Sequence, residues 1–141
     1  MTLDLSSLEN ALTQLEQVVA RSQDERFMSA QDEITRNAMR AGVIQHFEIA
    51  YELCWKFIQR WIRENRTPAE ADYPRTRKEL FRLAARYGLV KDPLPWFAYG
   101  DARNITTHTY NEADAVTVYA QAAPLARDAR YLLERLKEEN V

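Results

Sequence analysis

The sequence predicts an all-α fold, because three features favour a few long helices over β-strands. The chain has 141 residues but only 3 Gly and 5 Pro, so residues that form tight turns are scarce. Apolar residues recur at steps of three and four in several segments, which is the period of an amphipathic helix. The longest of these segments, 30–64, contains no proline. A chain of this length can bury a core of its own, so we expect one domain over residues 1–141.

The first two helices are expected over 5–21 and 30–64, separated by a polar link at 22–28. Ser29, with Asp32 three residues later, matches the pattern of an N-cap for the second helix. Polar residues of this helix follow one narrow stripe, made of Gln45, Glu48, Glu52, Lys56, Gln59 and Arg63. Because most of its remaining circumference is apolar, we expect burial on two sides, within the chain and against a partner.

Three further helical segments follow a polar loop at 65–73. The first is expected from Pro74 to Gly88, since proline suits a first helical turn and glycine a helix end. The next begins at Asp92-Pro93 and should fray near Thr106, where β-branched residues cluster. The last is expected from Asn111, a cap paired with Asp114, to about Glu138, with a kink or break at Pro124.

Composition narrows the class of protein. Hydrophobic residues make up 46% and charged residues 28% of the chain, as in globular proteins and unlike disordered ones. The sequence contains no apolar stretch long enough to span a membrane, and its start does not resemble a signal peptide. The single cysteine, Cys54, cannot form an internal disulfide and fits a reducing compartment. We therefore expect a cytoplasmic protein.

The charge is distributed unevenly along the chain. A net charge of −2 argues against a protein that coats nucleic acid non-specifically. However, segment 1–33 is mainly acidic and segment 75–86 mainly basic, so an anionic ligand should bind near the second. The outer face of the helix expected there carries Arg75, Lys78, Arg82 and Arg86. These side chains would suit RNA or an acidic partner, although solvated helix faces commonly have this pattern.

The window 101–110, Asp-Ala-Arg-Asn-Ile-Thr-Thr-His-Thr-Tyr, contains the side chains best suited to chemistry. Arg103 can hold a phosphate through two hydrogen bonds, His108 can exchange a proton near neutral pH, and Tyr110 offers a hydroxyl for attack or modification. On an ideal helix Arg103 and His108 stand about 140° apart and about 7.5 Å apart in rise, so the three can converge but need not. A solvated helix end with a capping histidine is the alternative.

Two signatures resemble those of the nucleotidyltransferase substrate-binding proteins, a family of the HEPN superfamily. The run from Gly42 to Lys56, Gly-Val-Ile-Gln-His-Phe-Glu-Ile-Ala-Tyr-Glu-Leu-Cys-Trp-Lys, is similar to the family's helix-two signature. The run from Arg103 to Asn111 is similar to its second signature and fits the superfamily pattern of Arg, four residues, His, any residue, Tyr. Both occur in the expected order, so the resemblance covers nearly the whole chain.

The resemblance implies an up-and-down four-helix bundle with an additional helical segment, forming a dimer. It implies a partner, a minimal nucleotidyltransferase, and no cofactor or metal. In related toxin–antitoxin pairs, proteins with this motif are metal-independent ribonucleases, silenced when the nucleotidyltransferase adds AMP to the motif tyrosine. Arg103 and His108 would then be catalytic, Tyr110 the modified residue, and Asn104 and Asp101 supporting residues.

Two other functions stay open, a non-catalytic subunit that binds nucleotide or substrate for the nucleotidyltransferase and a helical scaffold. Bland roles are expected elsewhere: His46 and Cys54 in the packed core or interface, and the tryptophans in the core or dimer interface rather than stacked on bases. Glu48 and Glu52 share a helix face, but without a nearby metal-binding motif we expect a solvated or interface-lining face. On such a face they could pair with Lys56 or with an arginine from another helix.

Overall fold

The computed structural model describes residues 3–106 and 111–139, and the described residues form helices and connecting turns without any strand. The helices are α1 (Ser6–Gln23), α2 (Glu25–Ser29), α3 (Glu33–Asn65), α4 (Pro68–Asp72), α5 (Arg77–Arg86), α6 (Pro93–Thr106), α7 (Glu112–Ala120) and α8 (Ala122–Glu138). No described helix is both long and apolar enough to cross a membrane. The all-α prediction is confirmed.

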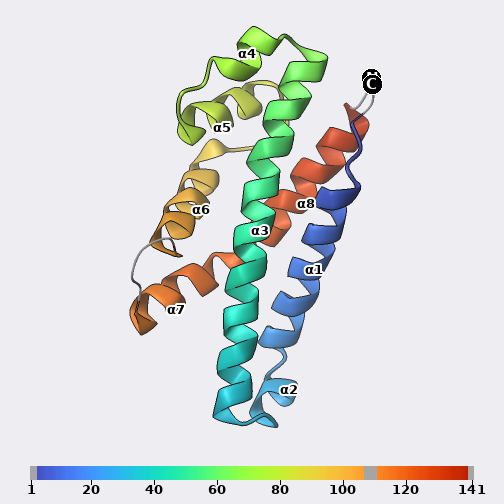
Figure 1. The fold of residues 1–141 in the computed structure, drawn as a ribbon. Helices are drawn as coiled ribbons and strands as arrows, with labels where there is room; N and C mark the ends of the chain where they lie inside the picture. Colours follow the sequence, from blue (N-terminus) through green and yellow to red (C-terminus); the bar gives the residue numbers. More distant parts are fainter. Residues whose placement is uncertain (1–2, 107–110, 140–141) are drawn as a thin grey trace.

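The helices form an up-and-down bundle around α3 (Figure 1). α1 runs down one side of α3, α6 runs down the other side, and α7 with α8 returns the chain to the starting end. α1, α3 and α8 pack against one another, while α4 and α5 cover the C-terminal end of α3 and α5 packs on α6. The additional helical segment is therefore α4 and α5, inserted between the second and third long helices.

The N-terminus of α3 differs from the prediction. Asp32 caps this helix by accepting a hydrogen bond from the Thr35 amide at 2.8 Å, so the expected cap at Ser29 is wrong. Ser29 is instead the last residue of α2, a short helix that Asp24 caps through the Phe27 amide at 3.0 Å. The predicted polar link therefore contains the helix α2. Asp24 caps this helix and Asp32, eight residues later, caps α3.

Two boundaries near α5 are also corrected. The predicted loop at 65–73 contains α4, which has Thr67 as its N-cap and Pro68 at its start. α5 begins after Thr76, whose hydroxyl accepts from the Glu79 amide at 3.1 Å, and not at Pro74. Its predicted end is confirmed: Gly88 has a positive φ of 75°, which favours glycine.

The predicted signals in the last third of the chain are confirmed. Asp92 accepts from the Leu94 amide at 3.0 Å at the start of α6, and Asn111 forms a reciprocal capping box with Asp114 at the start of α7. The predicted helix is interrupted at Gln121, between α7 and α8. Pro124 therefore lies in the first turn of α8, where a missing amide proton costs no helical hydrogen bond.

α3 packs against most of the other helices along its C-terminal two-thirds. Its buried side chains begin only at Val43, and they contact helices on both sides of the bundle. Burial of α3 within the chain is thus confirmed, whereas its burial against a partner stays a prediction. α3 still exposes Ile34, with 81% of its surface accessible, and Ile49. The expected dimer stays a prediction.

Candidate functional site

Arg103 lies in the last turn of α6 and points back onto α3. Its Nε donates a hydrogen bond to Oε1 of Glu52 at 3.2 Å, and the two side chains keep only 22% and 23% of their surface accessible. The residues are 51 positions apart in sequence, so the packing of α6 beside α3 creates this ion pair. The expectation that Glu52 pairs with an arginine from another helix is confirmed.

Glu52 also contacts two further groups. Its Oε2 accepts from the Trp55 indole at 2.9 Å, and its Oε1 lies 3.4 Å from Nη1 of Arg77, at the start of α5. The Arg77 guanidinium lies over the rings of Trp55 and Tyr51, at 4.6 Å and 5.6 Å. One carboxylate therefore joins α3, α5 and α6, and the two guanidiniums leave a positive charge in excess.

These contacts leave part of Arg103 available for a ligand. Nη1 donates to the Thr106 hydroxyl at 3.3 Å, and that hydroxyl donates to the Arg103 carbonyl at 2.7 Å. Nη2 has no hydrogen-bond partner among residues 3–106 and 111–139. A guanidinium held at Nε in this way can present its outer edge to a phosphate.

The structure describes only some of the other residues predicted for the site. His108 and Tyr110 lie outside the described residues, so their convergence with Arg103 stays a prediction. Asp101 and Asn104 are exposed on α6, on the side that faces α5. Among the described residues no group of three or more His, Cys, Asp or Glu could hold a metal ion.

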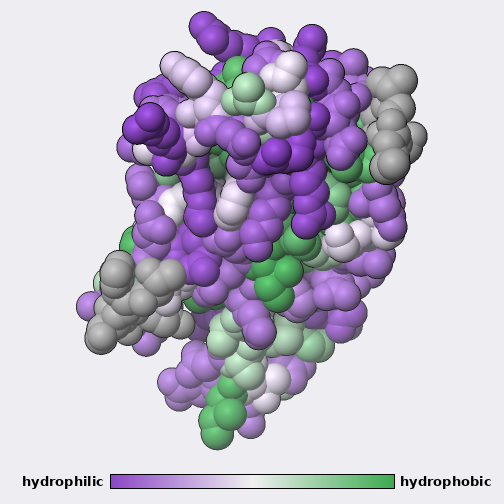
Figure 2. Space-filling model, turned by 45° about the horizontal axis from the view of Figure 1, so that its top comes forward, coloured by the Kyte–Doolittle hydropathy of each residue, from purple (hydrophilic) through white to green (hydrophobic). Residues whose placement is uncertain are grey.

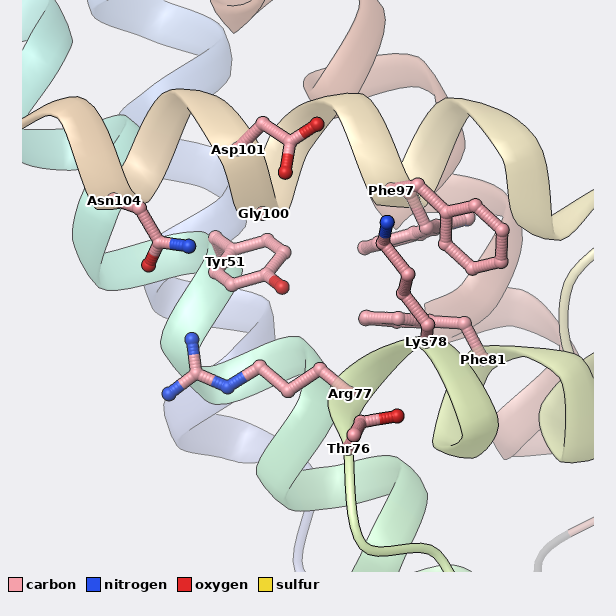
Figure 3. Close-up of a pocket in the computed structure, with 10 residues that line it drawn as sticks. Tyr51, Thr76, Arg77, Lys78, Phe81, Phe97, Gly100, Asp101 and Asn104 are labelled. Carbon is pink, nitrogen blue, oxygen red and sulfur yellow. The ribbon is translucent and has the colours of Figure 1, made fainter.

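A cleft of about 390 Å³ opens between α5 and α6, beside the Glu52–Arg103 pair. We call it the α5–α6 cleft, and its lining residues are Tyr51, Thr76, Arg77, Lys78, Phe81, Trp96, Phe97, Gly100, Asp101 and Asn104. In Figure 3 the phenol of Tyr51 lies beneath Gly100 with its hydroxyl turned toward the Lys78 side of the cleft. The cleft thus combines aromatic side chains with cations and one carboxylate.

Tyr51 and Gly100 form the closed side of this cleft. A Cβ atom at Gly100 would lie 2.7 Å from the Tyr51 hydroxyl oxygen, so any larger residue there would force the Tyr51 side chain or α6 to shift. Burial raises the pKa of Tyr51, and the adjacent Arg77 opposes part of that rise. The Tyr51 hydroxyl therefore stays protonated near neutral pH and can donate a hydrogen bond.

The four basic residues predicted as a row do not all line the same cleft. Lys78 lines the α5–α6 cleft and lies over the Phe97 ring at 5.6 Å, with Arg82 over the same ring at 5.1 Å. Arg82 and Arg86 also line a separate hollow of about 250 Å³, and Arg75 precedes α5. Of the row, Lys78 has the clearest relation to the site.

The bland expectations were mostly correct. Cys54 is fully buried, which raises the pKa of its thiol and makes it a poor nucleophile. Trp61 and Trp96 are buried in the core, whereas His46 and Trp55 are only half-buried. Sequence reasoning missed Arg77, Tyr51 and Gly100 as parts of the site. The one available signal was that Tyr51 precedes Glu52 within the first family signature.

Comparison with known proteins identifies the family. Residues 3–138 match the family model described as "Nucleotidyltransferase substrate binding protein like". The chain belongs to this family. A curated relative from Haemophilus influenzae, named "Probable ribonuclease HepT", is 36% identical over 138 residues, which cover 98% of this chain and 94% of the relative.

A solved structure from Haemophilus influenzae, described as the fold of a substrate-binding domain of a nucleotidyltransferase, matches with a TM-score of 0.88. It is 36% identical and the match covers 95% of this chain and 99% of that one. The family suggested by the two signatures is therefore confirmed. The relatives' names link this family both to ribonucleases and to nucleotidyltransferases.

Proposed function

We propose that the protein is a metal-independent endoribonuclease of the HEPN type. The observation that carries this is the Glu52–Arg103 pair, which holds one guanidinium beside a cationic, aromatic cleft. The name of the 36%-identical relative, "Probable ribonuclease HepT", supports the same function.

The proposed reaction divides the work between two residues. The 2′-oxygen of a ribose bonds to the adjacent phosphorus as its proton passes to a base, and the bond to the 5′-oxygen breaks as that oxygen gains a proton. His108 transfers these protons, and Arg103 stabilises the extra negative charge on the phosphate oxygens. The products are a 2′,3′-cyclic phosphate and a free 5′-hydroxyl.

A cleavage assay with purified protein tests this proposal. RNA should be cut in the presence of EDTA, and Arg103→Ala and His108→Ala should each reduce the rate by at least about 100-fold, as for other charge-stabilising and proton-transferring groups. Lys91→Ala is a suitable control, because Lys91 is an exposed cation over the Tyr131 ring, outside the site. Full activity in His108→Ala would refute the catalytic role assigned to His108.

We further propose that a minimal nucleotidyltransferase is the cognate partner and silences the enzyme by adding AMP to Tyr110. Each added AMP brings a negative phosphodiester close in sequence to Arg103 and His108, where it would compete with the RNA phosphate. With ATP, magnesium and the partner, the wild-type protein should gain mass in AMP steps and Tyr110→Phe should not. An unchanged wild-type mass would exclude this regulation.

A homodimer that acts in the cytoplasm is the proposed working form. Its support is the exposed apolar surface at the N-terminal end of α3 and on α7. A hollow of about 450 Å³ lies there, partly lined by Ile44, Ala115 and Val116. Figure 2 shows hydrophobic residues interrupting the otherwise hydrophilic surface in the lower half of the molecule.

The second candidate function is a non-catalytic subunit that presents a nucleotide or substrate to a nucleotidyltransferase. It is favoured by the description of the structural relative as a substrate-binding domain. Protein that binds nucleotide or the partner while RNA remains intact in EDTA would support this function over the ribonuclease.

A further inference from the structure

We propose that the α5–α6 cleft is a subsite for one nucleotide of the RNA, whose base enters the aromatic interior while its phosphate lies at the cationic mouth. This inference rests on the proposed ribonuclease function and adds a substrate-recognition site to it. Among the motif residues that the structure describes, 103–106, only Asn104 lines the cleft.

The interior of the cleft has the size and lining of a small-ligand site. Its volume of about 390 Å³ lies within the range of roughly 300–1,000 Å³ that is usual for such sites. Phe81 and Trp96 stack on each other with ring centroids 4.9 Å apart, and both are almost fully buried. Such rigid aromatic groups form a firm apolar wall against which a planar base can pack.

The outer side of the cleft is made by Phe97, which is only half-buried. Its ring already attracts two cations, from Lys78 at 5.6 Å and Arg82 at 5.1 Å. The electron-rich face that attracts these flexible cations can also stack on a base once the cations move aside. Figure 3 shows Phe97 and Lys78 on one side of the cleft and Tyr51 on the other.

The charged groups at the mouth match the parts of a nucleotide. Arg77 and Lys78 are exposed cations that can contact a phosphate. The carboxylate of Asp101 lies on the α6 side. A carboxylate can accept a hydrogen bond from a base amino group, which a bare phosphate or sugar phosphate lacks. The mixture of charges therefore favours a nucleotide over an inorganic anion.

The position of the cleft connects it to the proposed reaction. Arg77 lines the cleft and also lies 3.4 Å from the Glu52 carboxylate that holds Arg103. Asn104 lines the cleft and directly follows Arg103 on α6. A nucleotide bound here would therefore have its phosphate within the same group of cations as Arg103. RNA recognition of this kind, by stacking an unpaired base, requires single-stranded substrate.

Calorimetric titration of the His108→Ala protein separates base recognition from cleavage. The probes are the four nucleoside 5′-monophosphates and ribose 5-phosphate, which lacks a base. At least one nucleotide should bind about tenfold more tightly than ribose 5-phosphate, within the range that stacking of one base contributes. Equal affinities for all five probes, or no binding of any, would overturn the proposal.

Two variants locate the site in the cleft. Phe97→Leu keeps an apolar side chain but removes the ring, and should abolish most of the nucleotide preference over ribose 5-phosphate. Lys78→Ala should weaken all five probes, whereas its control Lys91→Ala, which removes a similar lysine from over Tyr131 at 4.7 Å, should not. Retained affinity in both Phe97→Leu and Lys78→Ala would place any binding elsewhere and refute the cleft as the subsite.

The two proposals fail in different ways. Nucleotide binding that Phe97→Leu removes, in a protein that leaves RNA intact, would refute the ribonuclease and retain the subsite. RNA cleavage that depends on His108 but has the same rate and sequence preference in Phe97→Leu would retain the ribonuclease and refute the subsite.

Discussion

Replacing Glu52 by glutamine should reduce RNA cleavage much more than it reduces stability. The Glu52–Arg103 pair is about one-quarter exposed, so solvent screening limits its contribution to folding to about 0.5–1 kcal/mol. Cleavage depends on where Arg103 points, and a displacement of about 1 Å at a reacting phosphate can cost roughly 100-fold in rate. Because a glutamine oxygen still accepts one hydrogen bond, we expect a decrease in kcat of about tenfold, equal to ~1.4 kcal/mol of barrier.

Glu16→Gln is the matched control for this variant. Glu16 on α1 pairs with Arg130 on α8, where Nε lies 3.0 Å from Oε2; the pair is somewhat more exposed, at 32% and 37%, and does not line the cleft. Chemical denaturation should give comparable losses of stability for both variants. Cleavage of a fluorescent RNA should show a lower kcat, with a smaller change in KM, for Glu52→Gln alone. Equal kcat values for the two variants would refute a positioning role for Glu52.

Three further predictions concern the fold and the assembly. Gly88→Ala should lower the free energy of unfolding by about 1 kcal/mol, because φ is 75° there, whereas Gly42→Ala, in mid-helix with no atom within 4 Å of the new Cβ, should raise it by up to about 1 kcal/mol in urea titrations. Val116→Asp should convert the proposed dimer to monomers in sedimentation experiments, whereas Leu94→Asp, which alters an equally exposed apolar residue (64% against 63%), should not; a dimer that survives both would place the interface elsewhere. Burial and a hydrogen bond to a carboxylate on α8 raise the pKa of Tyr99 above its ordinary value near 10, so the folded state keeps a proton that the unfolded state loses. Its contribution to stability is therefore complete below about pH 10 and is lost as the pH rises further. Between pH 9 and pH 11 the melting temperature should decrease less for Tyr99→Phe than for the wild type.

The helices could be predicted because their signals are local. Asn111 with Asp114, Asp92 before Pro93, and Gly88 each act within a few residues of their own position, and the structure confirms all three. The prediction failed at Ser29, where several capping residues compete within ten positions. Only the observed backbone shows that Asp32 is the residue that accepts from an α3 amide.

The sequence predicted which types of residue form the site, but not how they contact one another. Arg103 was identified from its residue type and motif, and Glu52 from its place on a polar stripe, but their contact depends on how α6 packs on α3. The cleft depends in addition on a shape match between Gly100 and Tyr51, two positions with no local pattern in common. Contacts between segments about fifty residues apart have no local pattern in a single sequence, so the partners and the shape of the cleft could not be derived from it.

The shared carboxylate makes binding and catalysis interdependent. Glu52 contacts Arg103, which we assign to the reacting phosphate, and Arg77, which we assign to the nucleotide in the cleft. When RNA phosphates approach, both guanidiniums gain a new anionic partner, and their remaining positive charge is matched by the substrate. A protein without Glu52 would keep two cations but lose the group that fixes their spacing, since α5 and α6 have no other described ion pair between them and α3. The geometry of the site is therefore set by one residue on the most deeply packed helix, and its two cations are carried by the helices on either side of the cleft.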